Sequence, residues 1–285
     1  DLPSPGGVPR TALLVARGTL DADDRVGVEL ADGAGTGVGE GAADPGDDLV
    51  GLMLSARDEE TGETMSRKQI GDELMTFMLA GHETTSNALA WTWRHLSLNP
   101  GARERLVEEV DAELGDRIPD MDDMERLPWT RACVEEAMRI DSPVWTVGRQ
   151  ALDDDEILGY RIPKGASVMV LISLIHRDPR IWTNPEGYDP TRFLPENSKD
   201  RPRHAFMPFG AGRRVCIGST FATVEATLLA AMFARRLRFD LPRGSNVEAE
   251  AAITLRPKNG MPMHVFHREP GQTDEPAPEA DLAAA

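Results

Sequence analysis

The chain has 285 residues, a formal net charge of −17 and 40% hydrophobic residues. The negative charge argues against nucleic acid or an anionic membrane as a partner, whereas the hydrophobic content suffices for a sizeable core. With only Cys133 and Cys216 the chain lacks a disulfide framework, and no apolar run approaches the roughly 20 residues that span a bilayer. We therefore expect a cytoplasmic location without a membrane segment in this chain, and leave an anchor ahead of Asp1 open.

The two ends of the chain differ in composition from its middle. Residues 1–46 are rich in glycine and acidic residues, and no aromatic residue precedes Phe77. A segment with so little to bury is expected to be disordered. Residues 270–285 are rich in proline, alanine and acidic residues and are predicted to be a disordered tail. The folded part is therefore expected to span residues 47–269.

Between these ends the pattern predicts a mainly α-helical fold with small β-sheets. Ser66 is placed to cap a long helix that Asn99-Pro100 ends. Residues 184–208 hold five prolines and are predicted to be an irregular loop, and Asn259-Gly260 is predicted to be the turn of a hairpin. The predicted helices span residues 66–98, 102–114 and 129–140, and a fourth follows Cys216 and ends near residue 236. The predicted strands span residues 147–152, 160–162 and 167–171.

One cysteine stands in a distinctive stretch, residues 209–218, which reads Phe-Gly-Ala-Gly-Arg-Arg-Val-Cys-Ile-Gly. A cysteine that binds a metal does so as a thiolate, so neighbouring groups must stabilise its charge. Arg214 lies just before Cys216, and the helix predicted after it turns unpaired N–H groups and its positive dipole end toward the sulfur. The stretch favours a metal ligand at Cys216, with a buried structural cysteine beside a glycine-rich turn as the alternative.

Four other residues of this stretch suit a large, flat partner. Gly210 and Gly212 allow the backbone to turn tightly and to approach such a partner closely. Gly218 keeps the first helical turn clear, and Phe209 can shield the sulfur from water.

The predicted helix 66–98 contains a polar window, residues 80–87, which reads Ala-Gly-His-Glu-Thr-Thr-Ser-Asn. Polar groups inside an otherwise apolar helix cost free energy unless they are paired or used. Gly81 also lowers helix propensity by about 1 kcal/mol relative to alanine. A merely solvated stripe is the alternative, but the polar and small residues cover every face of the helix. The window therefore indicates a functional position.

The pattern Phe-x-x-Gly-x-Arg-x-Cys-x-Gly of residues 209–218 resembles the haem-binding loop of the cytochrome P450 family. The resemblance implies haem b as the cofactor, with the thiolate of Cys216 as the axial ligand of its iron. It also implies that the phenylalanine and the glycines of the loop contact the haem.

Residues 80–84, Ala-Gly-His-Glu-Thr, are similar to the oxygen-binding groove of the same family. The resemblance implies that Ala80 and Gly81 line the space above the iron. It further implies that Thr84 hydrogen-bonds the activated oxygen and that Glu83 helps to relay protons.

Two further sets of charged residues match the family's pattern. Glu136 and Arg139, three residues apart on a predicted helix, resemble its Glu-x-x-Arg motif, and Arg192 resembles the partner arginine. The resemblance implies a structural network in which both arginines fork around one carboxylate. Arg149 and Arg214 match the arginines that pair with the haem propionates, with an ordinary surface arginine as the alternative for each.

These motifs follow one another in the family's order over about residues 47–267, so we expect the cytochrome P450 fold. Family members are considerably longer on the N-terminal side. We therefore expect the N-terminal portion, which would roof the pocket and make most substrate contacts, to be missing from this sequence.

The resemblance implies a haem-thiolate monooxygenase that inserts one atom of O₂ into an apolar organic substrate. Electrons from NAD(P)H would arrive through a separate ferredoxin or flavoprotein reductase. The alternative is a truncated, inactive haem-binding remnant or an interaction module. The substrate contacts expected in this chain are Ala80, Val144, Trp145 and Met261.

Overall fold

The computed structural model describes residues 10–14, 48–269 and 271. It divides into two compact units, one of residues Gly18–His82 and one of Asp1–Arg17 with Glu83–Ala285. The disorder expected for residues 1–46 and 270–285 falls on residues outside the described part, apart from two short pieces. Arg10–Leu14 form strand β1, which differs from the expectation for these five residues, and Gly271 lies in a turn.

The smaller unit contains helix α1 (Leu49–Ser55) and the first half of helix α2 (Arg67–Leu98). The carboxylate of Asp48 caps α1 by accepting the N–H of Gly51 at 2.8 Å. Ser66 caps α2 as predicted: its hydroxyl accepts the N–H of Gln69 at 3.3 Å, and the Gln69 side chain accepts the N–H of Ser66 at 2.8 Å. The predicted long helix is thus confirmed.

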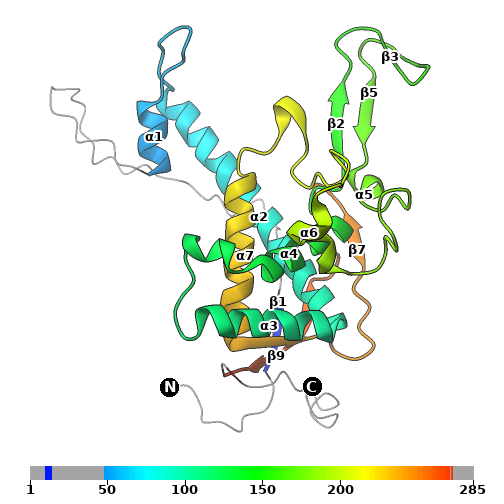
Figure 1. Ribbon diagram of the computed structural model, residues 1–285. Coiled ribbons are helices and arrows are strands. Elements are labelled where there is room, and N and C mark those ends of the chain that lie inside the picture. The colour runs from blue at the N-terminus through cyan, green and yellow to red at the C-terminus, as the bar shows by residue number, and fades with distance from the viewer. Residues whose placement is uncertain (1–9, 15–47, 270, 272–285) are drawn as a thin grey trace, which may run out of the picture. The chain divides into compact units, whose positions relative to one another are not determined.

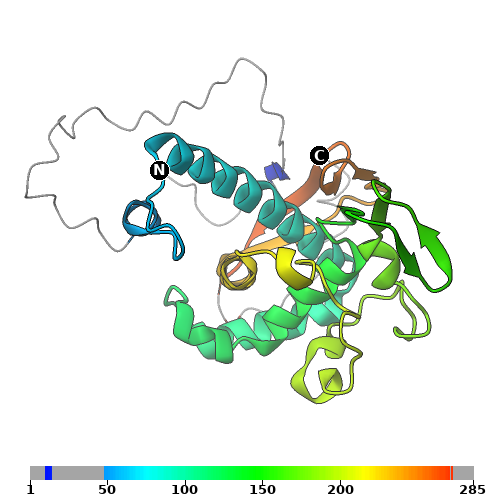
Figure 2. The same cartoon turned by 90° about the horizontal axis from the view of Figure 1, so that it is seen from above.

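In the larger unit, α3, α4 and α7 pack against one another (Figure 1), and Figure 2 views α7 along its axis. All three helices were predicted, and α3 begins at Pro100, two residues ahead of the expectation. The core between them is built around Trp93, Leu106, Val110 and Ala231. The helices of this unit are α3 (Pro100–Leu114), η1 (Met121–Glu125), α4 (Pro128–Ile140), α5 (Ile172–Ile175), η2 (Pro190–Phe193), α6 (Pro195–Ser198), η3 (Gly212–Arg214) and α7 (Ser219–Arg236).

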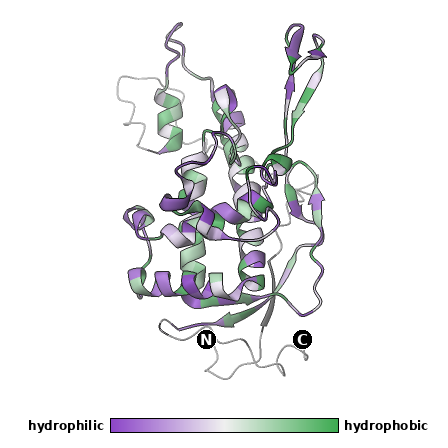
Figure 3. Cartoon of the chain, turned by 45° about the vertical axis from the view of Figure 1, so that its right-hand side comes forward, coloured by the Kyte–Doolittle hydropathy of each residue, from purple (hydrophilic) through white to green (hydrophobic). Residues whose placement is uncertain are grey.

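Four small antiparallel sheets complete the described part of this unit. Strands β1 and β6 flank β9, and the other sheets are the pairs β2–β5, β3–β4 and β7–β8. The tip of the ribbon that carries β3 and β4 is hydrophilic, which explains why β3 gave no strand signal in the sequence (Figure 3). The strands after β1 are β2 (Val147–Gln150), β3 (Asp155–Ile157), β4 (Tyr160–Ile162), β5 (Ser167–Val170), β6 (Leu237–Asp240), β7 (Ala249–Ala251), β8 (Leu255–Pro257) and β9 (Met261–His267).

The hairpin predicted at Asn259-Gly260 is wrong. The chain does turn there, with Gly260 at a φ of +81° and its N–H bound to the carbonyl of Pro257 at 3.2 Å. However, β8 pairs with β7, whereas β9 pairs with β1 and β6. The turn therefore passes the chain from one sheet to another.

Within the residues that the structure describes, none of the helices is both long and apolar enough to cross a membrane.

Candidate functional site

A buried ion cluster centres on the carboxylate of Glu136 in α4. Arg139 grips it with two parallel hydrogen bonds, from Nε to Oε2 at 2.7 Å and from Nη2 to Oε1 at 2.8 Å. Arg192 of η2 reaches the same Oε1 from Nε at 3.3 Å, and the N–H of Asp189 donates to it at 2.9 Å. The structure therefore brings the three residues of the predicted network together, and neither Glu136 nor Arg139 is exposed to solvent.

Arg139 also ties α4 to the irregular segment that follows α5. Its Nη1 donates to the carbonyls of His176 at 2.8 Å and Pro185 at 2.7 Å, and its Nη2 donates to that of Gly187 at 3.1 Å. One guanidinium thus satisfies three carbonyls and one carboxylate. Removing it would leave all of these acceptors short of a donor.

Cys216 stands at the end of a closed turn that leads into α7. Its N–H donates to the carbonyl of Phe209 at 3.0 Å, which closes the turn. Gly210 and Gly212 adopt φ angles of +73° and +74°, a conformation that residues with a Cβ rarely take, so the two glycines are needed for this geometry. A Cβ on Gly218 would lie 3.9 Å from the sulfur, in ordinary van der Waals contact with it.

The exposed residues in and after this turn supply a thiol, a cation and apolar surface. Cys216 and Arg214 are exposed, and Arg149 is exposed on β2. Two apolar side chains that follow the cysteine in sequence are largely exposed, Ile217 at 85% and Phe221 at 71%. A flat, apolar metal complex with acidic substituents requires a ligand for its metal, apolar contacts for its faces and cations for its acidic groups. The sulfur, the apolar side chains and the guanidinium groups meet these needs, so these residues fit a haem.

The carboxylate of Glu83 is held from the far end of the sequence. The hydroxyl of Thr254, in the turn between β7 and β8, donates to Glu83 Oε1 at 2.6 Å. The same hydroxyl accepts the side-chain N–H of Asn87 at 3.2 Å. Thr84 is half-buried next to Glu83, and Ala80 and Gly81 are exposed residues of the other unit.

The predicted substrate contacts lie in different environments. Val144 and Trp145 are half-buried, and Trp145 Nε1 donates to the carbonyl of Ala252 at 3.0 Å. Met261 differs from the expectation, because its side chain is fully buried in the core with Met263. Its apolar character reflects packing within the chain, and we do not carry it forward as a substrate contact.

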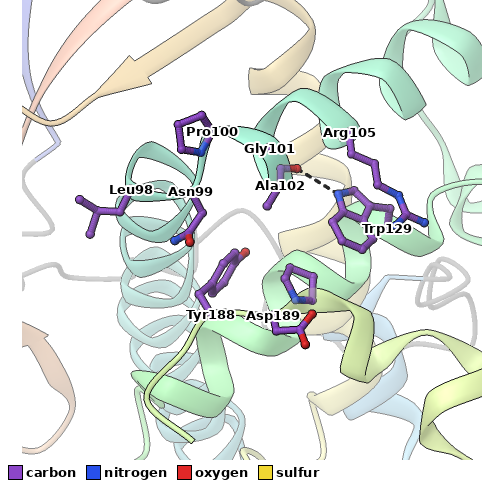
Figure 4. A pocket seen from close by; sticks show the side chains of 10 residues that line it. Leu98, Asn99, Pro100, Gly101, Ala102, Arg105, Trp129, Tyr188 and Asp189 are labelled. Carbon is purple, nitrogen blue, oxygen red and sulfur yellow. Dashed lines mark hydrogen bonds between the residues drawn. The ribbon is translucent and has the colours of Figure 1, made fainter. Parts of the chain in front are cut away.

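A surface pocket of about 580 Å³ lies where α2 passes into α3 (Figure 4). Its wall includes Tyr188 and Trp129, and Trp129 Nε1 donates to the carbonyl of Ala102 at 3.0 Å. The guanidinium carbon of Arg105 lies 3.8 Å from the centroid of the Trp129 ring. None of the predicted site residues lines this pocket, so it contributes nothing to the candidate site.

Thr254 and His176 contact the site and were missed by the sequence reasoning. Thr254 is 171 positions away from Glu83, and His176 accepts the N–H of Met207, 31 positions away, at 2.9 Å. Single polar residues in turns carry no periodicity, so only the folded contacts reveal them.

Comparison with known proteins identifies the family. The profile of the family described as Cytochrome P450 matches residues 40–262, so the chain belongs to this family. It is 48% identical over 221 residues to cytochrome P450 132 of Mycobacterium tuberculosis, covering 78% of this chain and 46% of that protein. It is 40% identical over 216 residues to cyclooctatin synthase of Streptomyces melanosporofaciens, covering 75% of this chain and 47% of that protein.

A solved structure gives the same result for the fold. The crystal structure of the cytochrome P450DA heme domain superimposes with a TM-score of 0.76 at 37% sequence identity, covering 83% of this chain and 53% of that one. The expected cytochrome P450 fold, helical with small sheets, is confirmed. The chain spans about half the length of these relatives.

Proposed function

We propose that this chain carries the haem-binding part of a haem-thiolate monooxygenase. Such an enzyme inserts one atom of O₂ into an apolar organic substrate and uses electrons derived from NAD(P)H. The observation that carries the proposal is the Cys216 turn, which presents a thiol beside apolar surface at the start of α7. Membership of the cytochrome P450 family, matched over residues 40–262, supports this reaction type.

A haem held by the Cys216 thiolate would supply oxygen activation, because a thiolate ligand promotes cleavage of the O–O bond. The protein's own groups would hold and serve this cofactor. Cys216 would place its sulfur at the helix N-terminus, where the backbone N–H groups favour a negative charge. Arg214 and Arg149 would bind the acidic substituents of the haem through their guanidinium groups.

Proton supply would be the task of the α2 residues. Glu83 accepts the Thr254 hydroxyl at 2.6 Å, so its carboxylate is held at a defined place on the helix. Thr84, the next residue, would offer a hydroxyl for orienting oxygen, and Val144 and Trp145 would contact substrate. A separate ferredoxin or flavoprotein reductase in the cytoplasm would deliver the electrons.

The decisive experiment uses the two cysteines as a matched pair. Cys216 is exposed, whereas Cys133 is buried in the core with its carbonyl bound to Tyr188 OH at 2.9 Å. The purified chain is loaded with haem, reduced and exposed to CO, and the difference spectrum is recorded. Wild type and Cys133→Ala should show the Soret band of thiolate ligation, and Cys216→Ser should lose it.

Two results would contradict the proposal. A band typical of histidine ligation in the wild type would show that another side chain binds the iron. Absence of haem binding in the wild type would favour the alternative of an inactive remnant or interaction module.

A further inference from the structure

One histidine connects two parts of the site that are far apart in the sequence. The backbone carbonyl of His176, directly after α5, accepts a hydrogen bond from Arg139 Nη1 at 2.8 Å. The imidazole Nε2 of the same residue accepts the backbone N–H of Met207 at 2.9 Å. His176 therefore contacts the buried ion cluster through its backbone and the segment before Cys216 through its side chain.

The packing around His176 fixes the direction of this acceptor. None of its surface is exposed, and its ring lies 5.2 Å from that of Phe206. Phe206 in turn meets Phe193 of η2 edge-on at 4.6 Å. The backbone N–H of His176 donates to the carbonyl of Ile172 at 2.9 Å. The imidazole cannot turn away from Met207 without opening this packing.

The backbone of Met207 is the start of the turn that ends at the cysteine. Its carbonyl accepts the N–H of Gly210 at 3.0 Å, and the carbonyl of Phe209 accepts that of Cys216 at 3.0 Å. Two consecutive hydrogen-bonded turns thus link the residue held by His176 to the residue that carries the sulfur.

We propose that His176 is a positioning residue that fixes the Cys216 turn to the Glu136–Arg139 cluster through the N–H of Met207. Because Nε2 accepts that N–H, the neutral ring carries its proton on Nδ1. The inference rests on the proposed function insofar as Cys216 is the iron ligand, whereas the anchoring is a property of the protein chain alone. A residue that only filled space could be replaced by leucine without consequence for the turn.

Two substitutions separate anchoring from packing. His176→Gln keeps an acceptor near the position of Nε2, and His176→Leu fills the space without one. Amide hydrogen exchange is measured at Met207 and Cys216 in the full chain without haem, with the α7 amide of Ala222 as the internal control, since it bonds to Gly218 O at 2.8 Å. In His176→Leu we expect exchange about tenfold faster at Met207, as loss of one hydrogen bond predicts, and faster exchange at Cys216. Ala222 should stay unchanged, and His176→Gln should resemble the wild type.

Three results would overturn the proposal: unchanged exchange at Met207, faster exchange at Met207 alone with Cys216 unaffected, or failure of glutamine to restore the wild-type rates. If His176→Leu does not fold, the ¹⁵N spectrum of wild-type His176 decides. An unprotonated Nε2 supports the proposal, and a protonated Nε2 overturns it. Because no step needs haem, a missing thiolate band would count against the proposed function and not against the anchor.

Discussion

The Glu136–Arg139 cluster and the Cys216 turn are both built around charge-bearing side chains, but they treat these side chains in opposite ways. In the cluster, the carboxylate and the guanidinium are fully buried and bound to one another. In the turn, Cys216 and the neighbouring Arg214 are exposed, although the backbone beneath them is closed by hydrogen bonds.

This difference separates residues whose charges are used inside the fold from residues that remain available to the proposed haem. A buried charge must find its partners within the chain, because desolvation costs several kcal/mol per ion. An exposed thiol or guanidinium remains solvated and can exchange water for a ligand. Substitutions in the cluster should therefore change stability, and substitutions on the outer side of the turn should change haem binding.

The largest effect is expected for Arg139→Ala. The substitution removes the bidentate partner of Glu136 and the donor to three backbone carbonyls. Breaking a buried ion pair from one side costs about 3–5 kcal/mol, which approaches the whole stability of many domains. Denaturant unfolding of the chain at neutral pH measures the loss.

Arg131→Ala is the matched control on the same helix. Arg131 also pairs with a glutamate, Glu135 at 2.9 Å, but the arginine is half exposed, so the loss should stay below about 1 kcal/mol. Equal losses for the two variants would remove the distinction between the fully buried pair and this partly exposed one.

The sequence predicted the members of the cluster better than their surroundings. Helical spacing places Glu136 and Arg139 on one face, and the family resemblance implied their network with Arg192. The helices α2, α3, α4 and α7 follow from periodicity and capping residues. The carbonyls that Arg139 binds belong to residues 176, 185 and 187, in a segment without periodicity. Such contacts depend on the tertiary fold and cannot be derived from local patterns.

The same limit explains the errors. Met261 was expected to contact substrate on the strength of the family resemblance, yet its side chain is fully buried in the core. Asn259-Gly260 has the composition of a hairpin turn, but strand pairing is decided by neighbours elsewhere in the sequence. Composition identifies turns well and strand partners poorly.

An intermediate effect is expected from pH, at the contact between cluster and turn. Burial, together with the positive charges of Arg139 and Arg177, lowers the pKa of His176 from 6.5 to about 4. Between pH 6.5 and about pH 4, His176 is protonated in the unfolded chain and neutral in the folded chain. The contribution of His176 to stability is therefore complete above pH 6.5 and falls by about 3 kcal/mol as the pH approaches 4.

Carboxylates also titrate in this range, so the quantity to compare is the difference between wild type and His176→Gln. Unfolding free energies measured from pH 7 to pH 4 should fall more steeply for the wild type. Parallel curves would mean that the imidazole can take up a proton in the folded chain, in conflict with its burial.

The smallest effect on stability, and a large one on haem, is expected for Arg214→Ala. Arg214 is exposed on η3, so its removal should change the free energy of unfolding by no more than about 0.5 kcal/mol. If its guanidinium binds an acidic substituent of the haem, the same substitution should weaken haem binding about tenfold, as loss of a charge-assisted hydrogen bond predicts.

Arg213→Ala is the matched control, because Arg213 is also an exposed residue of η3, next to Arg214. Titration of each variant with haem, beside its unfolding curve, measures both quantities. If both variants bind haem as tightly as the wild type, Arg214 is an ordinary surface arginine. If Arg214→Ala instead unfolds more easily, the turn belongs with the cluster as part of the stabilising framework, and the contrast between the two regions fails.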